Sequence, residues 1–99
     1  MSCPFCDRTS IDTVWASRLS LAFRDRYPVS PGHTLIIPRR HVATWFDATR
    51  EEQGDLLEAV NLLKARLDAE LQPRPDGYNV GINAGEAAGQ TVMHLHVHL

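Results

Sequence analysis

The chain has 99 residues, of which 43% are hydrophobic and 22% charged, so we expect one soluble domain with one modest core. A formal net charge of −2 argues against a protein that attracts nucleic acid through bulk charge. No run approaches the ~20 apolar residues of a membrane span, and Met1-Ser2-Cys3-Pro4 lacks the apolar stretch of a signal peptide, so a cytoplasmic protein is expected.

The first part of the chain predicts three short strands. Residues 19–23 carry large apolar side chains at alternate positions, which is the period of a half-buried strand, and residues 14–15 are expected to pair with them. Two prolines and a glycine make residues 28–32 a loop. The β-branched run at residues 34–37 predicts a third strand, which Pro38 closes.

One clear helix follows. Thr49 with Glu52 three residues later fits a capping box, which marks a helix N-terminus. Apolar residues then recur at spacings of four, three, four and four, which makes one stripe along a helix. The stripe comprises Leu56, Val60, Leu63, Leu67 and Leu71. The prolines of Gln72-Pro73-Arg74-Pro75 end the helix, and its pattern alone predicts a scaffold packed on a sheet.

The remaining segments complete an α+β fold. Asp76-Gly77 is a turn signal, residues 78–83 predict a strand, residues 84–90 a glycine-containing loop, and residues 92–99 the last strand. We therefore expect a mostly antiparallel sheet with one long helix packed on one face.

The last predicted strand carries three of the five histidines at alternate positions. His94, His96 and His98 would share one face, about 6.6–6.8 Å apart along the strand. The opposite face, toward the core, comprises Met93, Leu95, Val97 and Leu99. A neutral imidazole can ligate a metal or act as a nucleophile or proton carrier. A polar solvent face is the plain alternative, and three ligands on one flat strand do not easily close a tetrahedron around one ion.

Four segments resemble signatures of the histidine-triad (HIT) family. His94-Leu95-His96-Val97-His98-Leu99 resembles the triad, in which histidines alternate with apolar residues, and Gly89-Gln90-Thr91-Val92 resembles its lead-in. Residues 31–41, with Pro-Gly-His before the strand and Pro-Arg-Arg-His after it, are similar to the second signature. Cys3-Pro4-Phe5-Cys6 resembles the zinc half-site of many members. The matches span nearly the whole chain, so we expect residues 1–99 to form a single HIT domain that lacks the usual C-terminal tail.

The resemblance implies a catalytic role for three histidines. His96 would be the nucleophile that attacks the α-phosphorus of a nucleotide, and the resulting nucleotidyl-histidine would then be hydrolysed. His98 would contact the phosphate or help the leaving group. His33 would support the triad through a hydrogen bond, although a satisfied core histidine is an equally fair interpretation.

The resemblance also implies a nucleotide site. Asp25 would hold the ribose hydroxyls, and Asn83 would face the same pocket. Gly89, Gln90 and Thr91 belong to a loop whose main-chain N–H groups, with the Gln90 and Thr91 side chains, would bind the phosphate. Three apolar residues would form either a pocket for the base or part of the hydrophobic core, namely Phe5, Leu19 and Leu21.

Zinc would be held by Cys3, Cys6, His41 and His94, by resemblance to zinc-bearing members. Two thiolates and two imidazoles make a closed, structural site. The alternative is a pair of free thiols near the N-terminus.

These expectations predict a nucleotide hydrolase similar to diadenosine polyphosphate hydrolases and nucleoside phosphoramidases. The substrate would be a small-molecule nucleotide, either a dinucleoside polyphosphate or a nucleoside phosphoramidate, and the protein would be a homodimer that uses neither nucleic acid nor a membrane. Two alternatives stay open: a nucleotide- and zinc-binding interaction module without turnover, and a pure zinc protein that uses the triad as ligands.

Overall fold

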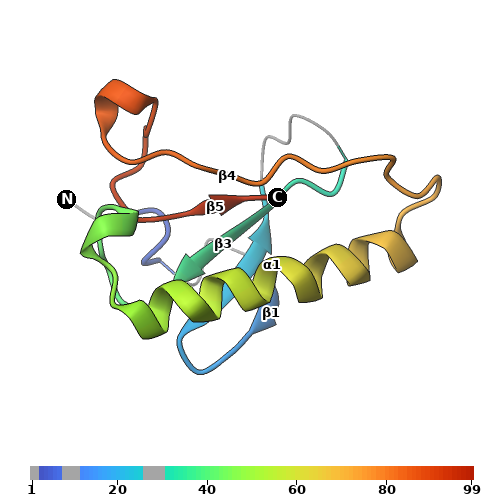
Figure 1. The fold of residues 1–99 in the computed structure, drawn as a ribbon, viewed down its shortest axis with the longest axis horizontal. Helices are drawn as coiled ribbons and strands as arrows, with labels where there is room; N and C mark the ends of the chain where they lie inside the picture. The colour runs from blue at the N-terminus through green and yellow to red at the C-terminus, as the bar shows by residue number, and fades with distance from the viewer. Residues whose placement is uncertain (1–2, 8–11, 26–30) are drawn as a thin grey trace.

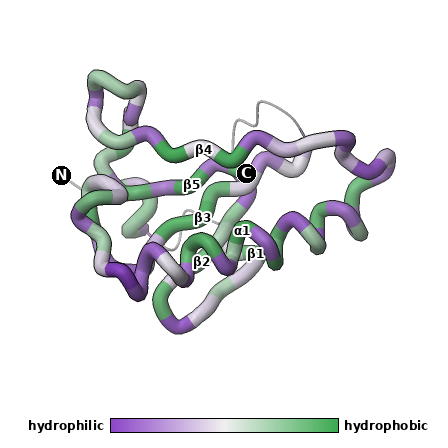
Figure 2. The backbone as a smooth tube through the Cα atoms, viewed as in Figure 1, coloured by the Kyte–Doolittle hydropathy of each residue, from purple (hydrophilic) through white to green (hydrophobic). Residues whose placement is uncertain are grey.

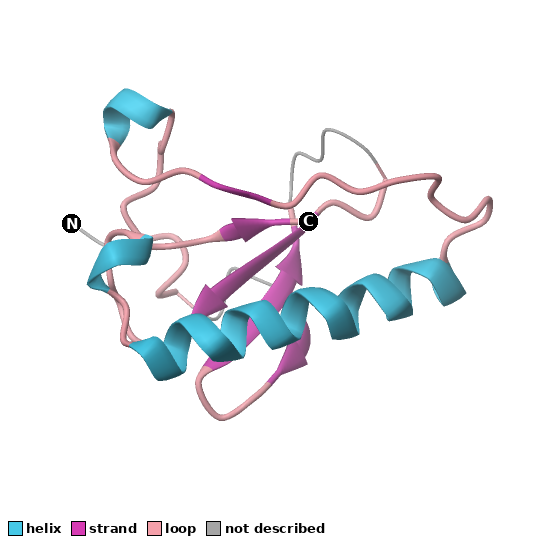
Figure 3. Cartoon of the chain, in the orientation of Figure 1, coloured by secondary structure: helices cyan, strands magenta, loops and turns pink. Residues whose placement is uncertain are grey.

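The computed structural model describes residues 3–7, 12–25 and 31–99, and its core is one antiparallel sheet with one long helix (Figure 1). The strand order is β1-β2-β3-β5-β4 and neighbouring strands are antiparallel. The elements are β1 (Thr13–Ala16), β2 (Ser20–Arg24), β3 (Thr34–Pro38), η1 (Trp45–Asp47), α1 (Arg50–Glu70), β4 (Gly81–Ile82), η2 (Glu86–Ala88) and β5 (Val97–His98). This arrangement confirms the expected α+β fold, with α1 lying along one face of the sheet (Figure 3).

Strands β1, β2 and β3 form two successive hairpins close to the predicted positions. In the register, Leu21 is opposite Ile37, and Ala22 is opposite both Trp15 and Ile36. The prediction of a half-buried β2 is wrong, because the strand is buried on both faces. Of the predicted loop at residues 28–32, only its last two residues lie within the part of the chain that the structure describes, and they form a turn.

Helix α1 begins as the capping box predicts. The Thr49 hydroxyl accepts the N–H of Glu52 at 3.1 Å, and the Glu52 carboxylate accepts the N–H of Thr49 at 2.9 Å. Leu56, Leu63 and Leu67 of the predicted stripe are at most 2% exposed. Hydrophilic and hydrophobic stretches alternate along α1 because only one side meets the sheet (Figure 2). No helix in the described segments is both long and apolar enough to cross a membrane.

The two C-terminal strands are shorter than predicted. Only Gly81 and Ile82 of the predicted 78–83 strand pair. Of the predicted 92–99 strand, Val97 and His98 form β5, and Leu99 exchanges two main-chain hydrogen bonds with Thr34, at 2.9 and 3.1 Å. Before β5, the N–H of Leu95 bonds the carbonyl of Val42, a residue beyond the end of β3, at 2.7 Å. Leu95 and Val97 are buried as expected, but Met93 is 41% exposed and does not join the core, because residue 93 lies ahead of the paired segment.

Apolar side chains form two clusters on the two faces of the sheet. The larger cluster lies between the sheet and α1 and includes Ala22, Ile36, Leu56, Ala59, Leu63, Leu67, Leu95 and Val97. The smaller cluster comprises Leu21, Phe23, Leu35 and Ile37, and the partly buried Phe5 packs against it. Phe5 and Leu21 therefore belong to the same apolar surface.

Candidate active site and metal centre

His96 lies directly before β5, and neighbouring groups hold its ring. The residue is 7% exposed, and its Nδ1 lies 2.8 Å from the carbonyl oxygen of His94. A carbonyl only accepts, so the ring proton is on Nδ1 and the lone pair is on Nε2. Edge-on ring contacts are made with Phe5 at 5.2 Å and with His98 at 4.8 Å. The neutral ring can therefore react or accept a proton through Nε2.

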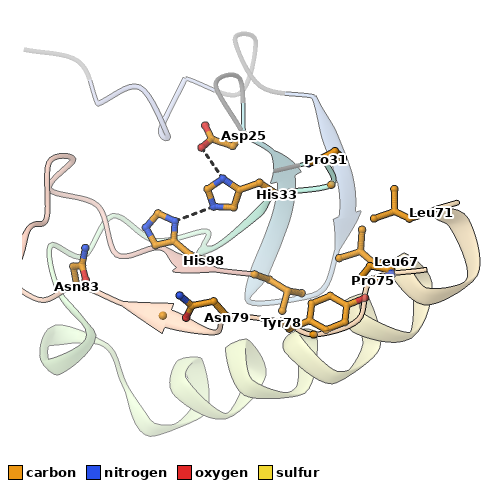
Figure 4. A pocket seen from close by; sticks show the side chains of 14 residues that line it. Asp25, Pro31, His33, Leu67, Leu71, Pro75, Tyr78, Asn79, Asn83 and His98 are labelled. Carbon is orange, nitrogen blue, oxygen red and sulfur yellow. Dashed lines mark hydrogen bonds and ion pairs between the residues drawn. The ribbon is translucent and has the colours of Figure 1, made fainter. Parts of the chain in front are cut away.

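Asp25, His33 and His98 form a continuous chain of polar contacts, although they come from three different strand ends (Figure 4). Asp25 Oδ2 lies 3.0 Å from His33 Nδ1, and His33 Nε2 lies 3.1 Å from His98 Nδ1. The negative charge of the Asp25 carboxylate favours a proton on the facing His33 Nδ1, although the contact has the geometry of an ion pair and not of a hydrogen bond. His33 Nε2 then accepts the Nδ1–H of His98, which leaves the lone pair of His98 on Nε2.

The surroundings of His98 favour its neutral form. Burial lowers the pKa of His98 below its usual value, and the neighbouring His96 and His33 rings lower it further, while the Asp25 carboxylate acts in the opposite direction. At neutral pH, the His98 ring is therefore an acceptor through Nε2.

A cavity of about 540 Å³ lies beside this polar chain (Figure 4). Its polar side is lined by Asp25, His33, Asn83 and His98, and its apolar side by Leu67, Leu71, Pro75 and Tyr78. Asp25 and Asn83 thus line one cavity, and their contact with a nucleotide stays a prediction. The other residues predicted to bind nucleotide, Gly89, Gln90 and Thr91, do not line it, and neither does His96.

The glycine-containing loop before the triad is held mainly by its own bonds. The N–H groups of Ala88 and Gln90 both bond the carbonyl of Gly85, at 3.1 Å. Gly89 adopts φ 96°, a left-handed conformation that other residues reach only with strain, and a side chain there would meet Asn83 at 3.4 Å. The loop thus has fewer free N–H donors than a phosphate nest predicts, but it brings Gly89 against Asn83.

Gln90 is the buried centre of this loop, at 2% exposure. Its Oε1 accepts the N–H of Gly85 at 2.8 Å, and its Nε2 donates to the carbonyls of Ala43 and Val92 at 2.6 and 2.9 Å. Both amide hydrogens are thereby engaged within the protein. The side chain holds the loop in place, and its contact with a nucleotide stays a prediction, as does that of the exposed Thr91.

The four residues predicted to bind zinc do come together. One ligand atom from each of Cys3, Cys6, His41 and His94 lies within 4.8 Å of the others. His94 Nδ1 is 3.5 Å from each sulfur and 3.2 Å from His41 Nδ1, which is itself 3.2 Å from the Cys6 sulfur. A tetrahedral zinc site with these donors has ligand–ligand edges of about 3.3–3.8 Å, so the donor set and its size fit a metal ion.

His94 is oriented for this cluster by a partner that no sequence pattern reveals. Its Nε2–H donates to the carbonyl of Pro38 at 3.1 Å, which leaves the Nδ1 lone pair directed at the cysteines. The residue is fully buried. Because the acceptor is a main-chain carbonyl, the residue type at position 38 gives no signal of it.

Comparisons with known proteins agree with this architecture. A family model described as the HIT domain matches residues 9–99. A crystal structure of a HIT family protein from Bacillus anthracis superposes with a TM-score of 0.89 at 36% identity, and the match covers 98% of this chain and 70% of that one. An uncharacterised HIT-like protein of Synechococcus elongatus is 43% identical over 91 residues, which are 89% of this chain and 75% of that protein.

Two relatives with named activities come from Schizosaccharomyces pombe. The adenosine 5'-monophosphoramidase is 36% identical over 103 residues, which cover 100% of this chain and 73% of that protein. The asymmetrical bis(5'-nucleosyl)-tetraphosphatase is 38% identical over 85 residues, which cover 86% of this chain but only 46% of that protein. The chain, with its alternating histidines and the sheet that carries them, belongs to the HIT family.

Proposed function

We propose that this protein is a nucleotide hydrolase that cleaves at the α-phosphate of a dinucleoside polyphosphate or a nucleoside phosphoramidate. The observation that carries the proposal is the state of His96, whose Nδ1 is engaged by the His94 carbonyl and whose Nε2 keeps its lone pair. The two named relatives act on these two classes of compound, by their names. The roles of the residues are argued from this structure, and the substrate class is inferred from the names of the two relatives.

In the first step, His96 Nε2 attacks the α-phosphorus, an Nε2–P bond forms, and the bond to the leaving group breaks. The leaving group departs with the bonding electrons, as a phosphate oxyanion from a dinucleoside polyphosphate or as the neutral amine from a phosphoramidate that is protonated on nitrogen. The ring becomes positively charged because Nδ1 keeps its proton, and the His94 carbonyl, 2.8 Å away, stabilises this charge. The fixed hydrogen bond also orients Nε2 for in-line attack.

In the second step, water attacks the phosphorus and displaces His96. His98 Nε2 accepts a proton from the water, and His33 and Asp25 stabilise the positive charge that reaches His98. The neutral ring favoured by burial is the form that can accept this proton. His98 thus acts as the base, and His33 and Asp25 act through it.

The nucleotide would extend from the imidazole row toward neighbouring polar groups. We assign Asp25 to the ribose hydroxyls through the carboxylate oxygen that does not face His33, and Asn83 to the same moiety or the phosphate. Gly89 and Thr91 would meet the phosphate through the main chain. The main contribution of Gln90 would be to hold that loop.

Cys3, Cys6, His41 and His94 would hold a structural zinc ion. Zinc held there would link the N-terminal segment to the chain before β5, and its role would be structural. Zinc loading should be measured by metal analysis of the purified protein, with one ion per chain expected and His41→Ala as the variant that loses it.

We further propose that the protein is a homodimer. Strand β4 lies at the edge of the sheet, and Val80 beside it is 50% exposed, while Leu57 on α1 is 52% exposed. A second copy would cover the apolar side chains and the strand edge. Analytical ultracentrifugation should give twice the chain mass of 11.1 kDa.

The decisive experiment is His96→Ala, assayed with diadenosine tetraphosphate and adenosine 5'-phosphoramidate. Turnover should fall by at least about 10⁴-fold, because the nucleophile is gone, while the affinity for AMP stays within about threefold. In the wild type, samples quenched in an alkaline denaturant, which preserves the acid-labile N–P bond, should show a protein carrying one adenylyl group by mass spectrometry.

The control is Phe46→Ala, which changes a side chain that is 81% exposed and outside both the site and the proposed dimer surface, and which should keep full turnover. Full activity in His96→Ala would rule out the mechanism. Measurable AMP binding without cleavage of any substrate in the wild type would favour the interaction-module alternative.

A further inference from the structure

The side chain of Phe5 connects the metal-ligand cluster to the nucleophile. Phe5 lies between Cys3 and Cys6 in the chain, and its ring reaches His96 at a centroid distance of 5.2 Å with an interplanar angle of 79°. The same ring contacts Phe23 at 5.3 Å and His94 at 6.0 Å. One aromatic ring therefore touches a metal ligand, the nucleophile and the apolar cluster on the open face of the sheet.

The main chain around Phe5 is a tight turn whose ends carry the two thiols. The N–H groups of Cys6 and Asp7 both bond the carbonyl of Cys3, at 3.1 and 3.2 Å. A metal bound to both sulfurs, His41 and His94 would fix this turn against the chain before β5. Because the turn is short, fixing its two sulfurs also fixes the position of the ring between them.

The ring of His96 depends on its neighbours for its orientation. Rotation of a histidine ring about its last side-chain bond is only weakly restricted, so packing and hydrogen bonds decide where Nε2 points. The His94 carbonyl fixes Nδ1, and Phe5 and His98 contact the ring edge-on. Loss of Phe5 would leave one side of the ring without packing.

We propose that Phe5 is a positioning residue for His96, and that metal binding by Cys3, Cys6, His41 and His94 is what holds Phe5 in place. Metal loss therefore loosens the nucleophile through this side chain as well as through His94 itself. The inference rests on the proposed role of His96, but its main test needs no turnover. A core residue that only fills space would not transmit metal binding to His96.

The test uses protein labelled at the ring Cε1 of histidine, followed by NMR at one fixed pH. The chain has five histidines, and the His96 signal is identified as the one lost in His96→Gln. In the wild type, removal of zinc by a chelator should shift and broaden this signal, and addition of zinc should restore it. Phe5→Ala loaded with zinc should show a similar displacement, and zinc removal should then move the signal by less than half the wild-type amount.

Matched variants separate this role from general packing. Phe5→Leu keeps apolar bulk and should restore part of the wild-type response if Phe5→Ala is poorly folded. Phe46→Ala removes a phenylalanine that is 81% exposed and should leave the His96 signal unchanged. In single-turnover assays, Phe5→Ala should lower the rate of the first step about 10-fold relative to the wild type. In steady-state assays, its KM should stay within about twofold of the wild-type value.

Three results would overturn the proposal. They are a His96 signal that Phe5→Ala does not move, an equal effect of zinc removal in wild type and Phe5→Ala, and a protein that does not retain zinc when it is supplied. If only the nucleotide hydrolase proposal fails, turnover will be absent, but the His96 signal will still respond to zinc through Phe5.

Discussion

The two faces of the sheet are covered in different ways. On one face, the 21-residue helix α1 lies over the larger apolar cluster. On the other face, a four-residue apolar cluster with the single ring of Phe5 lies beside the polar row of His33, His96 and His98. The larger share of the apolar burial therefore lies on the helix-covered face, and the proposed catalytic histidines lie on the other face, where Phe5 and neighbouring rings pack against them.

The largest expected effect is a loss of stability on the face of the sheet that α1 covers. Leu63→Ala removes a side chain that is 1% exposed under α1, and it should cost about 2–5 kcal/mol of the free energy of unfolding because a cavity remains. Urea denaturation measures this value. Leu62→Ala is the matched control, since Leu62 is 43% exposed on the same helix. This variant should lower the free energy of unfolding by about 0.5 kcal/mol or less. Equal losses for both variants would contradict the assignment of the core.

On the opposite face, His33→Ala should affect turnover more than stability. The His33 ring links Asp25 to His98, and its loss should lower turnover about 10–100-fold, which corresponds to about 1.4–2.7 kcal/mol. Steady-state kinetics and urea denaturation should be run on the same preparation. An unchanged turnover combined with a stability loss as large as that of Leu63→Ala would show that His33 contributes to stability and not to the reaction.

The start of α1 gives a smaller, pH-dependent effect. Glu52 is 5% exposed, closes the capping box and pairs with Arg40 at 2.8 Å, and the Arg40 guanidinium lowers the pKa of Glu52. Glu52→Gln should cost about 1–2 kcal/mol at neutral pH. A carboxyl with a lowered pKa stabilises the fold above its ordinary pKa of about 4.3 and loses that contribution as the pH falls through the lowered value. Denaturation curves of the two proteins should therefore converge in acid, and a gap that stays constant would refute the ion pair's role.

The smallest effect concerns the titration of His98. Its lowered pKa means that the ring is neutral in the folded protein down to a pH below about 6.5, and that protonation below this value opposes folding. NMR should give a midpoint below that of an unfolded histidine. Asp25→Asn should lower the midpoint further by a fraction of a pH unit, because Asp25 raises the pKa of His98. An upward shift would mean that the Asp25 carboxylate does not act on His98 as described.

Local patterns were sufficient to predict most of the scaffold. The capping box of Thr49 and Glu52 depends on residues three apart, and the stripe of Leu56, Leu63 and Leu67 depends on helical periodicity, so both can be recognised in the sequence. The lengths of β4 and β5 could not be predicted, because they depend on where the partner strands end. Alternation of side chains predicts a strand but says nothing about pairing over its whole length.

The candidate site divides in the same way. The four candidate metal ligands were predicted through the family resemblance, and the structure brings them together. The hydrogen bonds of Gln90 to the carbonyls of Ala43 and Val92, and that of His94 to Pro38, had no signal in the sequence. Main-chain carbonyls are present at every position, so residue type cannot mark the ones that orient a side chain.

The carbonyl of His94 has a consequence for how this site can diverge. It fixes the reactive tautomer of His96, and it belongs to the main chain, so every amino acid at position 94 would provide it. A lineage without the proposed metal could therefore replace the imidazole of His94 and still keep the Nδ1-protonated form of His96 that the proposed mechanism uses. Such a lineage would need a different anchor for the N-terminal turn, and compensating substitutions should accumulate around position 5 before they reach position 96.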